Sequence, residues 1–213
     1  MALILLIRHA ATSQTGKRLY GRAPGNHLSD AGREQAAALA VRLAPIPLEA
    51  VYVSPMDRCR ETASPLVRGR GLRLRRVADL NEVDYGAWTG RTFGSLHRSK
   101  LWRRVRSSPA SVRFPGGETL HEVQQRAVRA LEEIAARHAN GVVAVVTHGD
   151  VVRLALAHYA GVHLDLFQRL EVFTGSVTAV VLGDHGPRIV RVNDTGDLGD
   201  LVPPGRRRGK VGG

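Results

Sequence analysis

Continuous apolar runs along the chain alternate with segments in which apolar residues recur every three or four positions. Unbroken runs of Ile, Leu, Val and Ala are typical of buried strands, whereas alternating Leu and Arg are typical of a strand with one exposed face. The predicted strands are residues 2–7, 50–53, 72–77, 142–146, 176–182 and 188–192, of which 72–77 is the alternating one. The run at 142–146, made only of Val and Ala, is the strongest strand signal in the chain.

Segments with helical periodicity lie between these strands and predict helices at about 29–43, from residue 54, at 119–138 and at 150–160. Each predicted helix begins at a short polar side chain that can accept hydrogen bonds from the first backbone N–H groups: Ser29, Ser54, Thr119 and Asp150. Pro55, directly after Ser54, suits the first helical position. We therefore expect N-caps at these four positions.

Strands alternating with helices predict an α/β fold with three layers (α/β/α), in which helices cover both faces of a mixed, mostly parallel central sheet. The length of 213 residues suits a single domain, which we place at residues 1–196. Residues 91–114 are predicted to form a basic, partly helical insertion in this domain. The Gly-, Pro- and Arg-rich residues 197–213 are predicted to be a disordered tail.

Composition narrows the surroundings in which the protein works. No apolar run approaches the roughly 20 residues of a membrane helix, so no membrane association is predicted. A single cysteine, Cys59, excludes a disulfide framework and fits a reducing compartment, so we expect a cytoplasmic protein. The sequence leaves the oligomeric state open between monomer and homodimer.

The formal net charge of +12, from 31 basic and 19 acidic residues, predicts that the protein attracts anions. An arginine-rich solvated surface accounts for such a balance, and so does binding of nucleic acid or of small anionic molecules. A salt-dependent gel shift would support the nucleic-acid alternative. We expect a small phosphorylated substrate as the partner and no nucleic acid.

Chemistry-bearing side chains gather where predicted strands end. In open α/β sheets, ligands bind outside the carboxyl ends of the strands. The residues placed there are Arg8 and His9 after the first strand, Arg58 in the first turn after the second, Glu82 in the loop over 79–90, and His148 and Gly149 after the run at 142–146. Two histidines, two arginines and one carboxylate are therefore predicted to converge on one edge of the sheet.

The two arginines suit a phosphoryl group, which carries about two negative charges near neutral pH and is matched by the planar guanidinium fork. Arg8 and Arg58 are predicted to hold the phosphate, with His148 as a third donor. Gly149 would let the backbone approach the phosphate closely, and the helix that starts nearby would point N–H groups at it.

His9 and Glu82 are the predicted catalytic residues. Neighbouring cations lower the pKa of a histidine, so His9 would be neutral and able to attack phosphorus. The leaving alkoxide needs a proton, for which Glu82 is the candidate general acid and, later, base. The chain contains no His-Glu-x-x-His motif and no P-loop pattern, so it predicts neither a zinc site nor a nucleotide-binding loop.

Five blocks of sequence follow one another along the chain, and four of them contain the candidate residues. They are residues 5–9 (LLIRH) with Thr12, 54–63 (SPMDRCRETA), 80–90 (LNEVDYGAWTG), 115–119 (PGGET) and 146–150 (VTHGD). In this order they resemble the motifs of the histidine phosphatase superfamily, the phosphoglycerate-mutase-like proteins. The resemblance spans about residues 3–194. It implies the phosphoglycerate-mutase-like fold and hydrolysis of phosphomonoesters through a phosphohistidine, with no metal and no organic cofactor.

Position by position, the resemblance implies the roles already assigned: a nucleophile at His9, a proton donor at Glu82, and phosphate ligands at Arg8, Arg58 and His148. Two positions depart from the family pattern. Ala10 stands where the family usually has glycine, and Thr15 stands where it often has an asparagine that contacts the phosphate. The Thr15 hydroxyl is expected to replace that amide, unless the loop takes a different course.

The loop over 79–90, which we call the acid loop because it carries Glu82, distinguishes two activities of this family. Its mutases usually carry a basic residue directly after the glutamate, where it helps to hold a substrate carboxylate, whereas this chain has Val83. The Gly-Gly-Glu-Thr block at 116–119 also resembles the phosphatase branches. We therefore predict a phosphatase. A phosphoglycerate-type mutase and a non-catalytic protein that binds phosphorylated ligands are the alternatives.

Overall fold

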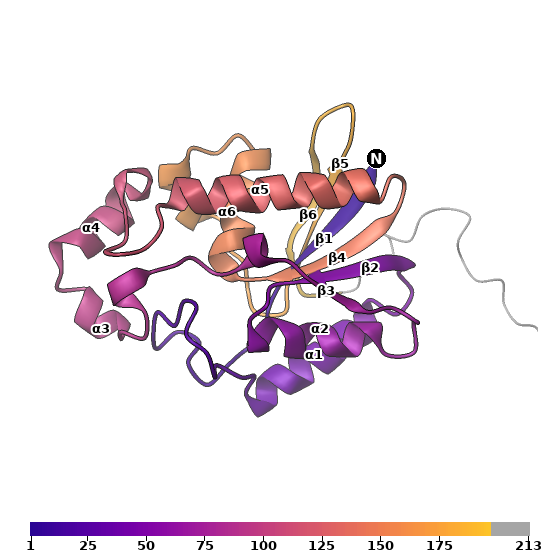
Figure 1. Cartoon of the computed structure of the whole chain (residues 1–213), viewed down its shortest axis with the longest axis horizontal. Coiled ribbons are helices and arrows are strands. Elements are labelled where there is room, and N and C mark those ends of the chain that lie inside the picture. The colour runs from indigo at the N-terminus through magenta and orange to yellow at the C-terminus, as the bar shows by residue number, and fades with distance from the viewer. Residues whose placement is uncertain (197–213) are drawn as a thin grey trace, which may run out of the picture.

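A six-stranded mixed sheet forms the centre of the computed structural model, which describes residues 1–196 (Figure 1). Its strands are β1 (Ala2–Arg8), β2 (Leu48–Val53), β3 (Leu74–Arg76), β4 (Val142–Thr147), β5 (Val177–Leu182) and β6 (Arg188–Asp194). In the order β3-β2-β4-β1-β5-β6, the first four strands are parallel to one another, and β5 is antiparallel to both β1 and β6. The prediction of a mixed, mostly parallel sheet is confirmed. The predicted tail at 197–213 lies outside the described residues.

Helices connect these strands and cover the sheet. The α-helices are α1 (Asp30–Arg42), α2 (Asp57–Val67), α3 (Phe93–Leu96), α4 (Lys100–Ser107), α5 (Leu120–Arg137) and α6 (Gly149–Tyr159). Short 3-10 helices lie between them: η1 (Ala78–Leu80), η2 (Gly86–Trp88), η3 (Pro109–Ser111) and η4 (Leu164–Arg169).

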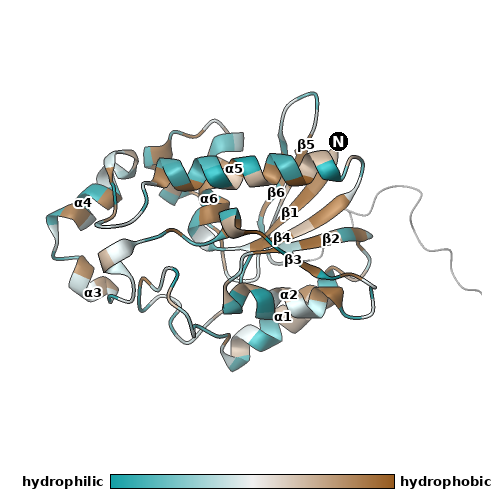
Figure 2. Ribbon diagram, in the orientation of Figure 1, coloured by the Kyte–Doolittle hydropathy of each residue, from teal (hydrophilic) through white to brown (hydrophobic). Residues whose placement is uncertain are grey.

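Alternate side chains of the central strands point to opposite faces of the sheet, and a different pair of helices covers each face. Leu5 and Ile7 of β1 belong to an apolar cluster with α1 and α2, whereas Ile4 and Leu6 belong to a second cluster with α5 and α6. In Figure 1, α5 and α6 lie on one side of the sheet and α1 and α2 on the other, and Figure 2 shows hydrophobic strands between them. The predicted three layers are confirmed.

Two of the predicted N-caps are confirmed. The Ser29 hydroxyl accepts a hydrogen bond from the Gly32 N–H at the start of α1. At the start of α5, the Thr119 hydroxyl accepts from the Glu122 N–H, and the Glu122 carboxylate accepts from the Thr119 N–H in return. This reciprocal capping box fixes the point at which the long helix leaves the turn before it.

The other two predicted N-caps are wrong, because both side chains bond elsewhere. α2 begins later than predicted, at Asp57, and the Ser54 hydroxyl instead lies 2.8 Å from Nε2 of His148. α6 begins before Asp150, whose carboxylate accepts a hydrogen bond from the Tyr85 hydroxyl at 2.8 Å. Both side chains are therefore used near the carboxyl edge of the sheet and not at a helix start.

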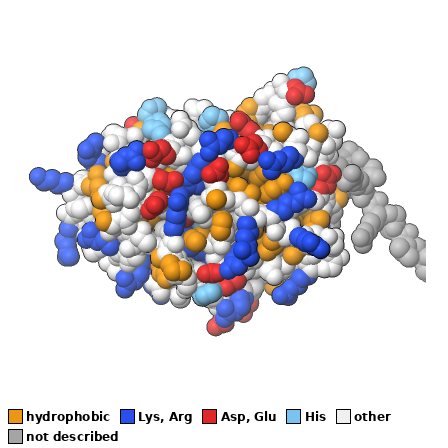
Figure 3. All heavy atoms as spheres, viewed as in Figure 1, with side chains coloured by type: hydrophobic (Ala, Val, Ile, Leu, Met, Phe, Trp, Pro, Cys, Tyr) orange, Lys and Arg blue, Asp and Glu red, His pale blue; other side chains and the backbone are white. Residues whose placement is uncertain are grey.

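Residues 91–114, which we call the cap, contain α3, α4 and η3. They cover a third apolar cluster, which includes Trp88, Leu96, Val105 and Phe114 and which α5 and α6 complete from the other side. In Figure 3, several Lys and Arg side chains lie on the surface at the end of the molecule that contains α3 and α4. Among the described residues, no helix is both long enough and apolar enough to cross a membrane.

Candidate active site

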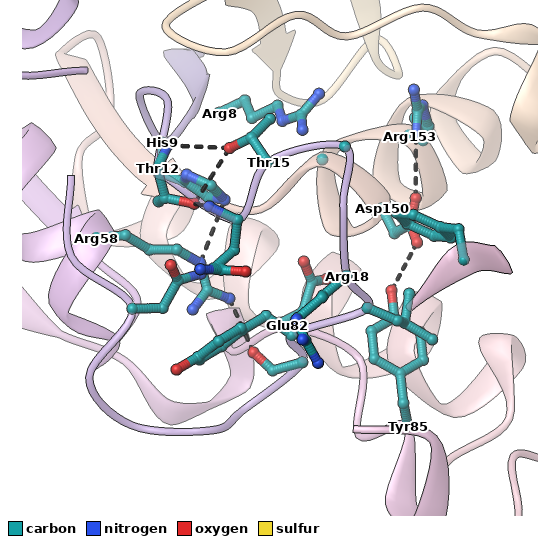
Figure 4. A pocket seen from close by; sticks show the side chains of 18 residues that line it. Arg8, His9, Thr12, Thr15, Arg18, Arg58, Glu82, Tyr85, Asp150 and Arg153 are labelled. Atoms are coloured by element: carbon teal, nitrogen blue, oxygen red, sulfur yellow. Dashed lines mark hydrogen bonds and ion pairs between the residues drawn. The ribbon is translucent and has the colours of Figure 1, made fainter. Parts of the chain in front are cut away.

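A pocket opens at the carboxyl ends of β1, β2 and β4, where the strand-end rule predicts it (Figure 4). Its cavity volume is about 160 Å³. Its walls include the predicted site residues Arg8, His9, Thr15, Arg58, Glu82 and Gly149, while His148 is fully buried behind them. Within residues 1–196, no group of three His, Cys, Asp or Glu side chains is arranged to hold a metal ion.

His9 follows β1 and is held in one tautomer by the backbone. Its Nδ1 lies 2.8 Å from the carbonyl oxygen of Ala10, which can only accept, so Nδ1 carries the proton. Nε2 is therefore the basic nitrogen, and it accepts a hydrogen bond from Nε of Arg58 at 3.2 Å. Burial, together with the positive charge of Arg58, lowers the pKa of His9 to about 3. The imidazole is neutral at physiological pH, with its lone pair beside a guanidinium.

Arg58 lies in the first turn of α2 and connects three parts of the site. The residue is only 3% exposed. Besides its bond to His9, it donates from Nη2 to the Gly21 carbonyl at 2.9 Å and to Nδ1 of His148 at 3.0 Å. The guanidinium thus lies between two histidine rings, which pack edge to face with centroids 5.4 Å apart.

Arg8, the last residue of β1, lines the pocket and contains a buried donor without a partner. Its Nη1 donates to the Val172 carbonyl at 2.6 Å, whereas its buried Nε has no hydrogen-bond partner among the described residues. Gly149 makes room for it, because a Cβ there would lie 3.1 Å from Arg8 Nε. A buried N–H without a partner is unfavourable, so an anion that accepts from Nε would be bound with a gain in free energy.

His148 belongs to a chain of hydrogen bonds that leads away from the pocket. Because Arg58 can only donate, Nδ1 of His148 accepts, and Nε2 carries the proton that it donates to Ser54 Oγ at 2.8 Å. Ser54 in turn donates to Oδ1 of Asn81 at 3.0 Å. Burial and the charge of Arg58 lower the pKa of His148 well below its ordinary value. The predicted third phosphate donor must therefore gain a proton on Nδ1 before it can donate.

Glu82 lies in the loop after η1, with its carboxyl group on the pocket wall (Figure 4). Its Oε1 accepts from the Val83 N–H at 3.1 Å, and its Oε2 is 3.7 Å from Nδ1 of His148, beyond hydrogen-bond range. Burial and the nearby negative charge of Asp150 raise the pKa of Glu82 to about 7. Both protonation states are therefore populated near neutral pH, as in a group that alternates between acid and base.

The two departures from the family pattern lie in the loop after His9. Ala10 is fully buried with Leu28 and Ala36, so its methyl group fills space in the core and not in the pocket. Thr15 lines the pocket, and its Oγ1 accepts from the Thr12 N–H at 2.9 Å and lies 3.2 Å from the Thr12 hydroxyl. These bonds shape the loop, and the phosphate contact of Thr15 stays a prediction.

The pocket wall also contains residues that the sequence did not point to, among them Arg18, Tyr85, Asp150 and Arg153. Asp150 accepts from the Tyr85 hydroxyl at 2.8 Å and from Nη1 of Arg153 at 3.1 Å. A signal existed for two of them, since Asp150 directly follows the His-Gly pair and Arg153 is one helical turn further on the same face. Arg18 comes from a loop whose course no periodicity predicts.

Val83, the residue after the candidate acid, is fully buried in the apolar cluster beneath the cap. It does not line the pocket, so the position at which the mutases usually carry a base contributes only packing here.

An α/β/α fold with two arginines, two histidines and a carboxyl group at the ends of its parallel strands defines an enzyme of the phosphohistidine type. The sequence pattern of the histidine phosphatase superfamily (branch 1) matches residues 4–195, and the chain belongs to this superfamily. The predictions of the family, of its fold and of a phosphatase are thereby confirmed.

Named relatives and solved structures resemble the chain over nearly its whole length. "Phosphoserine phosphatase 1" of Hydrogenobacter thermophilus is 29% identical over 203 residues, which cover 94% of this chain and 96% of that protein. The structure of Bacillus stearothermophilus YhfR has a TM-score of 0.86 and 27% identity, with coverage of 91% of this chain and 98% of the other. A mycobacterial glucosyl-3-phosphoglycerate phosphatase has a TM-score of 0.80 and 25% identity, with coverage of 90% and 98%.

Proposed function

We propose that the protein hydrolyses phosphomonoesters in two steps, with Nε2 of His9 as the nucleophile and Glu82 as the general acid and then the general base. The observation that carries this proposal is the state of His9. Its Nδ1 proton is fixed on the Ala10 carbonyl, and its lowered pKa leaves Nε2 unprotonated beside Arg58. A neutral imidazole of fixed tautomer among cations is suited to attack a dianionic phosphoryl group.

In the first step, Nε2 of His9 forms a bond to phosphorus while the bond to the ester oxygen breaks. The leaving oxygen takes the proton of Glu82, so this step needs the protonated carboxyl group. Because the pKa of Glu82 is about 7, its acid form predominates below neutrality. We therefore expect kcat/KM for an alkyl phosphate to fall as the pH rises above 7.

In the second step, water attacks the phosphohistidine. The Glu82 carboxylate takes a proton from the water as its oxygen bonds to phosphorus, and inorganic phosphate is released. The phosphorylated ring of His9, which keeps its proton on Nδ1, is cationic and leaves as neutral imidazole. Both residues thus return to their starting protonation states.

We assign the binding of the phosphoryl oxygens to Arg8, Arg58, His148, Thr15 and Gly149. Arg8 offers its unpaired Nε, and Arg58 can turn its Nε from the nucleophile to the phosphate once the N–P bond forms. Gly149 is the first residue of α6, whose leading N–H groups have no partners within the helix. A bound dianion would raise the pKa of His148 and let its Nδ1 donate.

The proposed substrate is a small phosphorylated molecule, hydrolysed in the cytoplasm without a metal, an organic cofactor, a nucleic acid or a membrane as partner. The proteins that resemble this chain are named for phosphoserine and glucosyl-3-phosphoglycerate. These two esters and 3-phosphoglycerate are therefore the first compounds to compare as substrates.

The test is turnover of p-nitrophenyl phosphate in excess EDTA by the native protein, by His9→Ala and by His185→Ala. His185 is an exposed histidine outside the pocket and serves as the matched control. We expect metal-independent release of phosphate that His9→Ala abolishes and His185→Ala leaves unchanged. Full activity of His9→Ala would rule out the mechanism. With 3-phosphoglycerate and 2,3-bisphosphoglycerate, formation of the isomeric ester in place of free phosphate would identify a mutase.

A further inference from the structure

Glu118 lies behind the acid loop, in the turn before α5, and its carboxylate is saturated with donors. Its Oε1 accepts from Nε of Arg126 at 2.9 Å. Its Oε2 accepts from Nη2 of Arg126 at 3.0 Å, from Nη2 of Arg22 at 2.9 Å and from the Asp84 N–H at 2.9 Å. The first two bonds form a bidentate fork, the strongest geometry between these groups. We call Glu118, Arg126 and Arg22 the clamp.

Both arginines of the clamp also bind the backbone of the acid loop. Arg126 of α5, only 9% exposed, donates to the carbonyl oxygens of Asp79, Asn81 and Glu82 at 2.6, 2.7 and 3.1 Å. Arg22 donates from Nε to the same Glu82 carbonyl at 2.8 Å. Two guanidinium groups from distant segments therefore hold the backbone of the one residue to which we assign proton transfer.

The turn at 115–118 fits the acid loop closely enough to require glycine on both sides. The Glu118 N–H donates to the Asp84 carbonyl at 2.9 Å, and a Cβ on Gly117 would lie 2.2 Å from that carbonyl oxygen. Gly86 has a φ of 50°, and a Cβ there would lie 2.1 Å from the Pro115 carbonyl oxygen. The Gly-Gly-Glu stretch thus serves as a rigid support for the loop as well as preceding a helix.

Burial alone would raise the pKa of Glu118, but the hydrogen bonds from Arg126 and from the Asp84 N–H outweigh it and lower that pKa below its ordinary value. The clamp is therefore charged and hydrogen-bonded, with the Arg126 side chain buried and the Glu118 and Arg22 side chains 20% and 34% exposed. Buried charges carry a large desolvation penalty, and apolar side chains of similar volume would pack a loop against a helix at less cost. Apolar side chains, however, could not donate directional hydrogen bonds to the Glu82 carbonyl.

We infer that Glu118, Arg126 and Arg22 are positioning residues for proton transfer, which hold the Glu82 backbone so that its carboxyl group meets the leaving oxygen. This inference rests on the proposed function. General acid catalysis depends on a proton transfer over hydrogen-bond distance, so a small displacement of the Glu82 main chain is enough to impair it. The hydrogen bonds of the phosphate ligands Arg8 and Arg58 go to other residues than Glu118, Arg126 and Arg22.

The inference predicts a dependence on the leaving group that general loosening of the fold would not produce. p-Nitrophenolate leaves unaided, whereas the alkoxide of glycerol phosphate needs a proton. Because kcat/KM reports only the steps up to departure of the alcohol, it isolates this requirement. For Glu118→Gln we expect kcat/KM to fall about tenfold or more with glycerol phosphate and less than about threefold with p-nitrophenyl phosphate.

Arg129→Gln is the matched control, because Arg129 lies one turn along α5 and binds the exposed Asp79 carboxylate at 3.1 Å. Such an exposed pair contributes little, so both substrates should react at the native rate. Arg22→Gln, at a more accessible position of the clamp, should show the same selective loss as Glu118→Gln and replaces it if Glu118→Gln does not fold. An equal loss with both substrates, or no loss with either, would overturn the inference.

Glu82→Gln, measured in the same assay, separates this inference from the proposed function. If Glu82 is the acid, Glu82→Gln reacts slowly with glycerol phosphate and much less so with p-nitrophenyl phosphate. Equal rates for both substrates in Glu82→Gln would refute the role of Glu82 itself. Selectivity in Glu82→Gln without selectivity in the clamp variants would refute only the clamp.

Discussion

The inner end of the pocket, formed by His9, Arg58 and His148, differs in structure from the mouth of the pocket, where Arg18 lies. At the inner end, His9, Arg58 and His148 are at most 7% exposed, and all four ring nitrogens of the two histidines have hydrogen-bond partners. At the mouth, the side chain of Arg18 is exposed and donates only to the Gly90 carbonyl among the described residues, at 3.0 Å. The inner end is fixed by many mutual bonds, and the mouth by few.

The charges of the two regions differ in the same way. The inner cations are arranged around groups that take part in the proposed reaction, with Glu82 and Asp150 close by. The cap, of which Phe93 lines the pocket, has no acidic residue, since none occurs between Asp84 and Glu118, and its cations are exposed (Figure 3). From this difference we expect the inner end to carry the proposed chemistry, and the mouth to affect which anions arrive and how tightly they bind.

The largest effect is expected at the inner end, from Arg58→Lys. An ammonium group cannot reproduce the three hydrogen bonds of the guanidinium to His9, Gly21 and His148. We expect kcat/KM for p-nitrophenyl phosphate to fall by about 10²–10³-fold, as when a preorganised donor is removed from an active site. Arg68→Lys, at an exposed arginine just beyond α2, is the control and should keep native activity. Loss of less than about threefold in Arg58→Lys would mean that a single positive charge suffices there.

A second inner-end prediction concerns stability. The pKa of Glu82 is raised to about 7 in the fold from its ordinary value of 4.5, so the folded protein holds a proton that the unfolded chain releases. The contribution of Glu82 to the free energy of unfolding is therefore fully present below about pH 4.5. It falls as the pH rises toward 7, by about 1.4 kcal/mol per pH unit and by about 3 kcal/mol at most. Glu82→Gln does not titrate, so its stability relative to the native protein should rise between pH 5 and pH 8.

Urea unfolding of both proteins at the two pH values measures this difference, because contributions of the other titrating groups cancel. Glu132→Gln, at an exposed glutamate of α5, is the control and should follow the native protein at both pH values. A stability difference between Glu82→Gln and the native protein that is the same at pH 5 and pH 8 would contradict a raised pKa at Glu82.

The sequence predicts features that depend on short-range interactions better than features that depend on contacts between distant residues. Unbroken apolar runs and the rule for strand ends were enough to bring Arg8, His9 and Glu82 together, since both depend on local pattern and topology. The capping box at Thr119 is equally local. Ser54 bonds instead to a residue 94 positions away, and the sequence could not show that this competing partner would lie so close.

The same limit applies to the turn before α5. Glu118 reads as a carboxylate favoured by the dipole of the helix that follows it, and nothing in its spacing points to Arg22, 96 positions earlier. The mouth was the least predictable region, because exposed loops such as the one that carries Arg18 follow no hydrophobic period. The residues of the proposed chemistry were therefore predictable from the sequence, and the residues at the mouth of the pocket were not.

A smaller effect is expected at the mouth, from Arg18→Gln. Arg18 lines the pocket, and no carboxylate pairs with it within residues 1–196, so it is available to a second anionic group on the substrate. We expect KM for phosphoserine to rise about fivefold, as for a partly exposed ion pair of about 1 kcal/mol, with kcat nearly unchanged. KM for p-nitrophenyl phosphate, which has no second anion, should change less. Arg91→Gln, an exposed neighbour outside the pocket wall, is the control, and equal effects of Arg18→Gln on both substrates would count against this role.

The smallest effect is expected from the cap, in a variant that combines Lys100→Gln, Arg103→Gln and Arg106→Gln. These side chains of α4 are exposed, none of them forms an ion pair in the described part of the chain, and none lines the pocket, so we expect them to act on the substrate through the long-range field. At low ionic strength we expect kcat/KM to fall about two- to threefold, with kcat unchanged. The effect is small because the variant removes only three charges. The screening length shrinks from about 30 Å at 0.01 M salt to about 3 Å at 1 M, so the native protein and the variant should converge as salt is added. If the salt dependence of kcat/KM is the same in both, the cap cations only keep the surface solvated, and selection at the mouth depends on the pocket wall alone.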